Sequence, residues 1–525
     1  MKTARRILAF LMAITVLGFV LAGCGGKGSA GTAASLDSGA GSEGTSASKG
    51  GEPEKVVMAM ICFNKIPDDM NRINEAISKF TLAKANVETD LRLYGPADFA
   101  QKINLALSSG EQMDLFLPPM TEPLGTWVAK NQLLALDELI SKYGKGMLDK
   151  LNEDFGEGLL KATTINGHIY AVPVNKGMAI PATVVYNADI LQGAGLTEND
   201  ITSLESLTRV FEAVKAKYPD IVPFGPINAN PSDTGLMWYL NCIGEADKLS
   251  EPSEVGVVLG DSGKVVNMYE TDLFKNGVKT VRSWYSKGYI QKDAATATTS
   301  FSDMVNSGRG FAFMGGYSGK EIGKVFSLQS GKNIASKRTA PFYFDTSAVN
   351  SVIWGINSTT KVPDAAMKLL ALTYTDADVL NTIMYGIEGE DYVKVDEHHV
   401  KYPEGKSTDT VAYSQPLVSG VLGSESLQYL FDGSNYDDTK LKMEENKTTK
   451  RSPYFGFVFD PKDVKTELSV INNVKNQYLP GLVCGTLDPD TTIPKFIKAL
   501  NDAGAQTVIQ KKQEQLDKWL AGQGK

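Results

Sequence analysis

The chain has 525 residues, with 53 lysines and arginines against 61 aspartates and glutamates, and a net charge of −8 at pH 7. An acidic surface repels phosphate groups, so this balance argues against nucleic acid and anionic membrane as ligands. Only four cysteines are present, with no Cys-x-x-Cys pair, so a disulfide framework is excluded. A single bridge between Cys242 and Cys484 stays open as an alternative.

The first 24 residues have the pattern of a lipoprotein signal. Three basic residues precede the apolar run 7–20, and the sequence LAGC of residues 21–24 follows and resembles a bacterial lipobox. The run is too short for a comfortable membrane-spanning helix. We therefore expect residues 1–23 to be a signal peptide, removed before Cys24, whose thiol would carry a diacylglycerol. An uncleaved anchor, or an ordinary secretory signal with an incidental cysteine, is the alternative.

Residues 24–53 are mainly Gly, Ser, Ala and Thr, a composition that cannot bury enough surface to fold, so they predict a flexible tether. The rest of the chain, about 470 residues, is long for a single hydrophobic core and suggests two lobes. If Cys24 is acylated and palmitate-type chains hold it in the bilayer, these lobes would face the outside of the cell membrane, as in Gram-positive cells.

The first part of this globular region alternates between strands and helices. A continuous apolar run at 55–63 predicts a buried strand, apolar residues at three- and four-residue steps predict a helix over 70–80, and alternation predicts a second strand over 87–94. A helix over 97–109 and a strand over 114–118 follow. This order predicts a doubly wound parallel α/β sheet, with ligands beyond the carboxyl ends of its strands. Asn64, Lys65 and residues 118–121 occupy those ends.

Several segments further along carry a family resemblance. They are 109–115, 167–173 (GHIYAVP), 186–191 (YNADIL), 272–288, 310–317 (GFAFMGGY) and 354–357 (WGIN). Their order resembles extracellular solute-binding proteins of the sugar-binding family 1, the substrate-capturing lipoproteins of ABC importers. The resemblance implies a two-lobed α/β fold of the type II periplasmic-binding-protein kind, with a central cleft and extra C-terminal helices.

The C-terminal third narrows the resemblance. Segments 385–392, 455–460 and 513–520 resemble the LplA-like branch, whose C-terminal region is a domain of unknown function (DUF3502). This implies a first lobe over 54–175, a second over 176–352, a return to the first over 353–395, and a region packing on the lobes over 396–525. Apolar stripes independently predict amphipathic helices over 464–478, ended by Pro480-Gly481, over 493–500 and over 508–520. Residues 432–438 and 444–449 have the composition of solvated surface segments.

Motifs for chemistry are weak. Residues 315–321 resemble a phosphate-binding loop, but a glycine is one residue late and Glu321 replaces the hydroxyl that would bind magnesium. His398 and His399 lack further ligands at metal-binding spacing. No Gly-x-Ser-x-Gly elbow stands at a strand-to-helix turn, and nothing selects one carboxylate pair for glycoside hydrolysis. We expect no catalytic residue, no metal and no cofactor.

Aromatic side chains carry the positive signal, because a sugar ring presents an apolar C–H face and a rim of hydroxyls. The resemblance implies that Tyr317 reaches the ligand from the second lobe and that Trp354 lies near the hinge. A surface turn for Tyr317 and a core position for Trp354 are the alternatives. Strand ends, loops and the resemblance together predict this ligand-binding set: Asn64, Lys65, Met120, Thr121, Asp233, Thr234, Trp238, Tyr317 and Trp354.

The resemblance implies a monomeric, lipid-anchored binding protein that captures a carbohydrate, most simply an oligosaccharide, and delivers it to the permease subunits of an ABC transporter. Ligand would close the lobes about hinge strands near 174–176 and 351–356. Three alternatives stay open: a surface-anchored carbohydrate-active enzyme (hydrolase or lyase), an adhesion lipoprotein, and a binding protein for peptide or lipid-linked glycan.

Overall fold

The structure, a computed structural model, describes residues 51–63, 65–120, 122–225, 235–251, 253–297, 301–415 and 420–523. These residues belong to one compact unit that begins at Gly50. The proposed signal peptide and tether lie outside the described residues, as do Cys24, Asn64, Thr121, Asp233 and Thr234. No helix in the described ranges combines the length and hydrophobicity needed to cross a lipid bilayer.

The first sheet has five described strands in the order β2-β1-β3-β14-β6. Strand β1 is parallel to β2 and β3, whereas β14 runs antiparallel between β3 and β6. The predicted strand-helix-strand-helix-strand order is confirmed. The strands are β1 (Glu54–Ile61), β2 (Val87–Tyr94), β3 (Leu115–Phe116), β6 (Val172–Pro173) and β14 (Ile353–Ile356).

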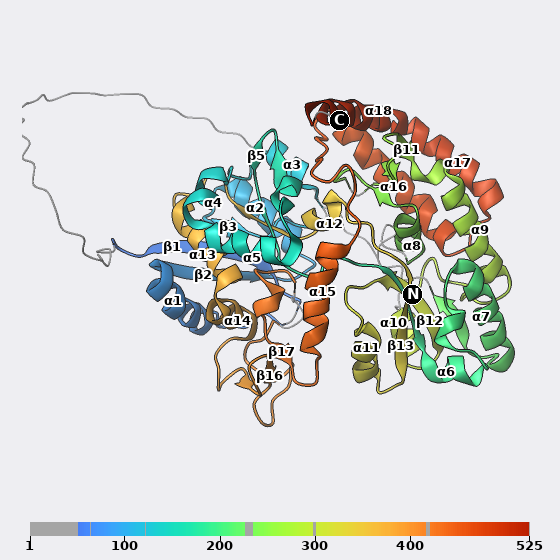
Figure 1. The fold of residues 1–525 in the computed structure, drawn as a ribbon, viewed down its shortest axis with the longest axis horizontal. Helices are drawn as coiled ribbons and strands as arrows, with labels where there is room; N and C mark the ends of the chain where they lie inside the picture. The colour runs from blue at the N-terminus through green and yellow to red at the C-terminus, as the bar shows by residue number, and fades with distance from the viewer. Residues whose placement is uncertain are drawn as a thin grey trace, which may run out of the picture. The chain divides into compact units, whose positions relative to one another are not determined.

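Helices cover both faces of this sheet because each presents an apolar stripe to it. In α1, for example, Ile73 and Ile77 have no exposed surface. The helices, seen in blue, cyan and amber in Figure 1, are α1 (Asn71–Ala85), α2 (Phe99–Ser109), α3 (Leu124–Ala129), α4 (Asp137–Tyr143), α5 (Lys145–Phe155), α12 (Thr346–Asn350), α13 (Pro363–Thr375) and α14 (Ala377–Tyr385).

The second sheet has the order β13-β7-β12-β8 among the described strands and forms the core of a second lobe. The strands are β7 (Ala182–Asn187), β8 (Val222–Gly225), β12 (Gly310–Gly316) and β13 (Ile334–Ala340). Its helices are α6 (Ala188–Gly193), α7 (Leu204–Lys217), α8 (Gly235–Ile243), α9 (Asp272–Ser286), α10 (Phe301–Asn306) and α11 (Ile322–Ser330).

Short elements complete the lobes. A small sheet beside the second core contains β9 (Ala246–Asp247), β10 (Val255–Leu259) and β11 (Val265–Asn267). The others are β4 (Thr164–Ile165), β5 (His168–Ile169), β15 (Val393–Lys394), β16 (His399–Lys401) and β17 (Leu430–Phe431), with 3-10 turns η1 (Leu159–Thr163), η2 (Glu198–Asp200), η3 (Met268–Glu270) and η5 (Glu425–Leu427).

The C-terminal helices pack on the second lobe. They are α16 (Lys465–Val483), α17 (Pro489–Asp502) and α18 (Ala505–Gly522), and Figure 1 shows them in red beside α9 and β11. The three predicted amphipathic helices are confirmed. The prediction that Pro480-Gly481 ends the first of them is wrong, since α16 continues to Val483. A proline removes one helical hydrogen bond, and burial of Leu479 and Leu482 opposes that loss.

The predicted surface segments 432–438 and 444–449 are mostly exposed, and a helix joins them. Helix α15 (Tyr436–Thr448) buries Thr439, Met443 and Asn446. The Asn446 amide donates to the Lys176 carbonyl at 2.8 Å and accepts from the Met178 N–H at 2.8 Å. Because its polar side chains have partners in the protein, this helix does not need an apolar stripe.

Cys242 and Cys484, which pack in the core of the second lobe, do not form a disulfide. Cys242 and Cys484 are both buried and free, so the alternative of a disulfide between them is wrong. Burial raises the pKa of each thiol to about 12, which leaves both protonated at neutral pH.

Three chain segments cross between the lobes. The first follows β6, the second follows β13, and the third follows α15. Backbone hydrogen bonds join the second and third: the Phe344 N–H donates to the Lys450 carbonyl at 2.9 Å, and the Ser452 N–H donates to the Phe344 carbonyl at 2.9 Å. Phe344 already packs in the first core. The lobes are therefore joined by a narrow group of hydrogen-bonded segments.

Candidate binding site

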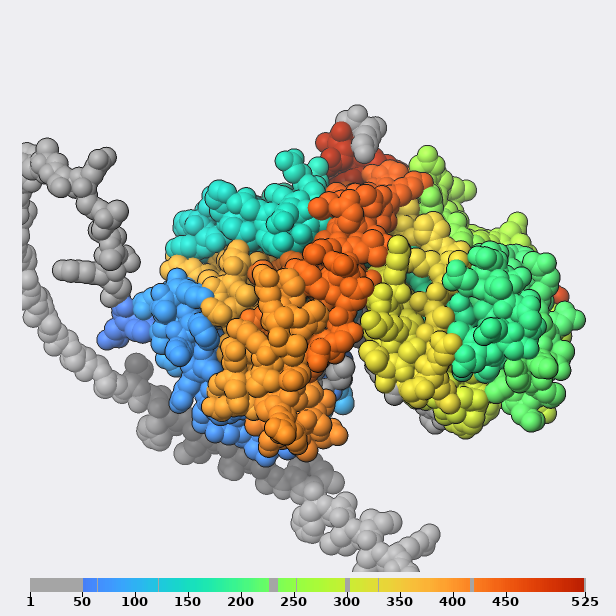
Figure 2. Space-filling model, turned by 60° about the horizontal axis from the view of Figure 1, so that its bottom comes forward, coloured from blue at the N-terminus to red at the C-terminus, as the bar shows by residue number. Residues whose placement is uncertain are grey.

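Two cavities lie against the crossing segments and share the side chains of Cys242, Phe342 and Tyr343. The larger has a volume of about 560 Å³ and the smaller about 230 Å³. Figure 2 shows the surface hollowed on one side of α15, between the orange residues that precede this helix and the yellow residues of the second lobe. The crossing region therefore offers two partly open cavities, of which the smaller is bordered by residues of both lobes.

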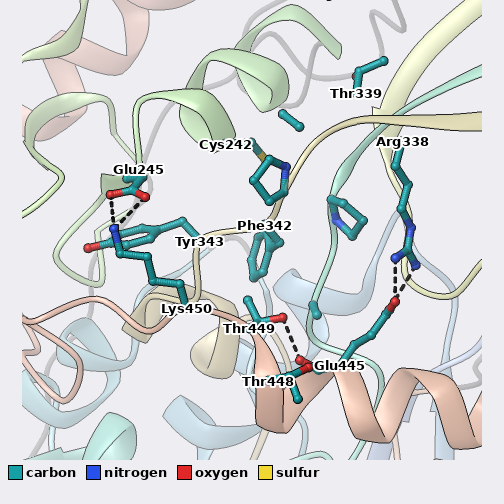
Figure 3. A pocket seen from close by; sticks show the side chains of 14 residues that line it. Cys242, Glu245, Arg338, Thr339, Phe342, Tyr343, Glu445, Thr448, Thr449 and Lys450 are labelled. Carbon is teal, nitrogen blue, oxygen red and sulfur yellow. Dashed lines mark hydrogen bonds and ion pairs between the residues drawn. The ribbon is translucent and has the colours of Figure 1, made fainter. Parts of the chain in front are cut away.

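Ion pairs occupy the walls of the larger cavity. The Arg338 guanidinium donates to both oxygens of Glu445 on α15, at 2.5 and 3.0 Å, and the Lys450 ammonium lies 2.6 and 2.7 Å from the two oxygens of Glu245. Figure 3 shows the Phe342 ring between these two pairs. Because each cation already has a carboxylate partner, the described residues of this cavity offer no uncompensated charge to a ligand.

The smaller cavity draws on both lobes and the crossing segments. Its residues are Met120, Glu122 and Pro123 from the first lobe; Trp238, Asn241, Cys242, Ala246, Lys248 and Ser250 from the second; and Ile180, Phe342, Tyr343, Asp345, Ser347, Ala348, Asn350 and Ser351 from the crossing segments and α12. Positions 238, 241 and 242 of α8 share one helix face, which explains how one helix supplies three of them.

An aromatic pair forms one wall of the smaller cavity. The rings of Trp238 and Phe342 are stacked, with centroids 6.2 Å apart and planes 9° apart. The Trp238 indole N–H donates to the Ile180 carbonyl at 2.9 Å, which fixes the ring. A Cβ atom at Gly316 would come within 2.3 Å of the indole, so only glycine there lets the ring lie against β12. The wall is therefore rigid and apolar.

Two asparagines, Asn241 of α8 and Asn350 of α12, also line this cavity. Among the described residues, the buried side-chain oxygens of Asn241 and Asn350 accept no hydrogen bond. The Asn350 amide nitrogen donates to the Ser250 hydroxyl at 2.9 Å, which directs the amide oxygen elsewhere. A buried acceptor without a donor is unfavourable, so a hydroxyl donor that reached either oxygen would be stabilised there.

Carboxylates border the cavity as well. Glu122 is paired with Lys130 at 2.6 Å. Asp345 caps α12 by accepting from the Ala348 N–H at 2.9 Å, and it accepts from the Lys248 N–H at 3.3 Å. Burial raises the pKa of Asp345 because a carboxylate is less well solvated there than in water.

The predicted site residues divide into three groups. Met120 and Trp238 border the smaller cavity, and the Met120 side chain is 45 % exposed. Lys65 is exposed at the carboxyl end of β1, where Phe63 is also exposed. Tyr317 is half-buried, with its ring edge-on to Phe326 at 6.2 Å, and burial raises its pKa to about 12. The remaining positions apart from Trp354 lie outside the described residues.

Trp354 lies in the core of the first lobe. It has no exposed surface, and its indole N–H donates to the Val421 carbonyl at 2.8 Å. This structure leaves no ring face open for a sugar, so the core alternative describes this residue and a direct stacking role does not. The reason is β14, which places residue 354 between β3 and β6 inside the sheet.

Sequence reasoning missed Phe63, Phe342, Asn241 and Asn350. Phe342 follows Pro341 directly after β13, and a proline at a strand end marks a chain that is about to turn. That signal could have directed attention to the crossing segment. Nothing in the local sequence distinguishes Asn241 and Asn350 from solvated asparagines.

The comparisons with known proteins agree with this geometry. A family model described as bacterial extracellular solute-binding protein matches residues 75–387. The chain belongs to this family. A second model, the domain of unknown function DUF3502, matches residues 453–521 of this solute-binding protein, which confirms the resemblance to a DUF3502 region. The bounds 396–525 for this region stay a prediction.

Similar proteins cover nearly the whole chain. A carbohydrate ABC transporter substrate-binding protein of Streptococcus pneumoniae is 28 % identical over 476 residues, which cover 89 % of this chain and 91 % of that protein. The crystal structure of the N-glycan transport solute binding protein NgtS from Streptococcus pneumoniae is 26 % identical with a TM-score of 0.74, and the match covers 90 % of this chain and 100 % of that one.

The same NgtS protein in complex with Man1GlcNAc gives 27 % identity and a TM-score of 0.68, with 89 % and 100 % of the two chains covered. These solved structures confirm the predicted two-lobed type II fold of this solute-binding protein. The relatives are substrate-binding proteins by description. The LplA-like branch stays a prediction.

Proposed function

We propose that this solute-binding protein captures an oligosaccharide between its lobes and delivers it, chemically unchanged, to the permease of an ABC transporter. The observation that carries the proposal is the stacked Trp238–Phe342 wall of one interlobe cavity, which is also lined by Asn241 and Asn350, whose buried amide oxygens have no partner among the described residues. A flat apolar wall beside amide side chains suits a sugar ring with an apolar face and hydroxyl donors. The relative NgtS has been crystallised with Man1GlcNAc and with Man5GlcNAc, which supports a glycan as the ligand.

The cell-surface location belongs to the same proposal. Acylation of Cys24 would hold a monomeric protein at the outer face of the membrane, and residues 24–53 would let the lobes reach both external sugar and permease. Binding and release require that the protein does not cleave its cargo. Asn64, Lys65, Thr121, Asp233, Thr234 and Tyr317 stay proposed ligand contacts on the basis of the sequence.

A thermal-shift screen over a panel of purified oligosaccharides tests the proposal. A ligand well above its dissociation constant raises the melting temperature, and chromatography of the recovered sugar should show it unaltered. Trp238→Ala should weaken binding of the active sugar by about 1 to 3 kcal/mol through lost ring contact.

Trp519→Ala is the matched control. Trp519 is also half-buried, but it lies on α18 against Phe457, away from the cavity. It should bind sugar as the wild type does. Degraded sugar, or equal affinity in the wild type and Trp238→Ala, would contradict the proposal.

A further inference from the structure

We propose that the smaller interlobe cavity selects an uncharged sugar unit and rejects acidic units such as uronic or sialic acids. This inference rests on the proposed function and names the class of sugar at that site. The hydrogen-bond acceptors and the charges that border the cavity support it.

The unpartnered side-chain oxygens of the cavity are hydrogen-bond acceptors. The Asn241 and Asn350 amide oxygens are acceptors without partners among the described residues, and the Asn350 nitrogen is already engaged with Ser250. A sugar hydroxyl can donate to such an oxygen, whereas an ionised carboxylate can only accept. The carboxylate of an acidic unit could not donate to these oxygens and would bring a negative charge into the cavity.

The charges of the cavity point the same way. Asp345 contributes a carboxyl group to its wall, and Glu122 contributes a second that is paired with Lys130 at 2.6 Å. Lys248 is the cationic side chain among the described residues of the wall, and its ammonium lies 3.6 Å from the fully buried carboxylate of Glu254. The carboxylate of an acidic sugar that entered this cavity would lose its hydration and lie near other carboxyl groups. Both effects disfavour its ionised form.

Cations elsewhere do not change this balance. Arg338 and Lys450 border the larger cavity on the other side of Phe342 and Tyr343, and Glu445 and Glu245 neutralise them. Recognition of an anionic sugar commonly uses a guanidinium fork, and no described residue of the smaller cavity is an arginine. The described residues of the wall therefore favour a neutral hydroxyl over a carboxylate.

The test compares two ligands that differ by one group. A neutral oligosaccharide that binds in the thermal-shift screen is oxidised at the C6 hydroxymethyl group of its terminal units to give the uronic acid form, and both are titrated into the purified protein by calorimetry. We expect the wild type to bind the acidic form at least tenfold more weakly. Glu122→Gln should narrow this ratio, because it removes one carboxylate from the wall.

Two asparagine variants test the hydrogen bonds. Asn241→Ala and Asn350→Ala should each weaken binding of the neutral sugar about tenfold, the loss of one hydrogen bond of ordinary strength. Asn306→Ala is the matched control. The Asn306 side-chain oxygen is also buried and unpartnered, but it lies on α10, at the opposite end of β12 from Trp238, and its loss should leave affinity unchanged.

The outcomes separate the two proposals. Equal affinity of the wild type for neutral and acidic forms would overturn the inference alone, as would asparagine variants that behave like Asn306→Ala. If no sugar of the panel binds the wild type, the proposed function fails and the inference fails with it.

Discussion

The Lys512 ammonium of α18 donates to the Glu251 carboxylate at 3.0 Å, with the lysine side chain fully buried. It also donates to the Gly256 carbonyl at 2.8 Å, and Lys475 of α16 pairs with the buried Glu254 at 3.1 Å. These contacts fasten the C-terminal region to residues 248–256, the segment that supplies Lys248 and Ser250 to the smaller cavity. The C-terminal region therefore packs against the segment that lines one side of the smaller cavity.

We expect Lys512→Met to lower the free energy of unfolding by about 3 to 5 kcal/mol, because it leaves Glu251 buried without its partner. Chemical denaturation measures the change. Lys511→Met is the control, since Lys511 is adjacent in sequence but pairs with Glu514 on the exposed face of α18. It should unfold as the wild type does. Equal stability of the two variants would show that the buried pair does not hold the region in place.

Trp354→Ala should lower the free energy of unfolding by about 3 to 5 kcal/mol, since it removes a fully buried indole and leaves a cavity in the first core. The Val421 carbonyl also loses its donor. Thermal and urea unfolding check the prediction. A stable Trp354→Ala protein that has lost sugar affinity would instead restore Trp354 as a direct ligand contact.

Helices and strands with a local apolar pattern could be predicted, while the partners of polar residues could not. The strand at 54–61 and the helix after it could be predicted because their apolar residues repeat at strand or helix spacing within a short stretch of sequence. Helix α15 was not predicted because one of its stabilising contacts is distant in sequence: the Asn446 amide donates a hydrogen bond to the backbone carbonyl of Lys176, 270 positions away. A helix stabilised by distant backbone groups leaves no pattern in its own sequence.

The candidate site was harder to predict for a related reason. Trp238 and Trp354 are both tryptophans that the sequence suggests as ligand contacts, and only the tertiary packing shows that one borders a cavity and the other lies inside a sheet. Phe342 gains its role from stacking on Trp238, 104 positions earlier in the chain. Sequence identifies the residue types that a sugar site uses, and the fold decides which of them meet.

The buried carboxyl of Asp247 makes stability depend on pH. Burial, and then the neighbouring Asp345, raise the pKa of Asp247 to about 7, whereas an unfolded aspartate has a pKa of about 4. Between these values the folded state keeps a proton that the unfolded state releases. This group's contribution to stability is therefore complete below about pH 4 and is lost as the pH rises to about 7.

Asp247→Asn should remove that dependence, since asparagine does not titrate. Urea unfolding at pH 5 and pH 8 would compare the two proteins. The difference in free energy of unfolding between the variant and the wild type should shift in favour of the variant from pH 5 to pH 8. The variant should also lose some stability at both pH values, because the Ser452 hydroxyl contacts the Asp247 carboxylate at 2.5 Å. Parallel pH profiles would assign the pH dependence to other groups.

Cys24→Ser should release the protein into the medium or leave it unprocessed, because no thiol remains to carry lipid. Membrane fractionation followed by immunoblotting measures both location and size. Ser29→Ala, a change within the tether, should stay in the membrane fraction. A Cys24→Ser protein that is membrane-bound and mature in size would disprove lipid anchoring at this residue.

Lobe closure is the last consequence of the site's position. Met120 comes from the first lobe and Trp238 from the second, and both border one cavity beside the crossing segments. A sugar that contacts both lobes binds the closed form better than the open form, so it shifts the population toward closure. Small-angle scattering should therefore show a smaller radius of gyration when the active sugar is saturating.

The control uses the same sugar with Trp238→Ala at a concentration that saturates only the wild type, where no compaction should appear. A sugar that fails the thermal-shift screen should also leave the wild-type curve unchanged. Tight binding without any change in the scattering curve would mean that the crossing segments hold the lobes at a fixed separation. The permease would then have to recognise the bound sugar itself, because the loaded and empty proteins would present the same surface.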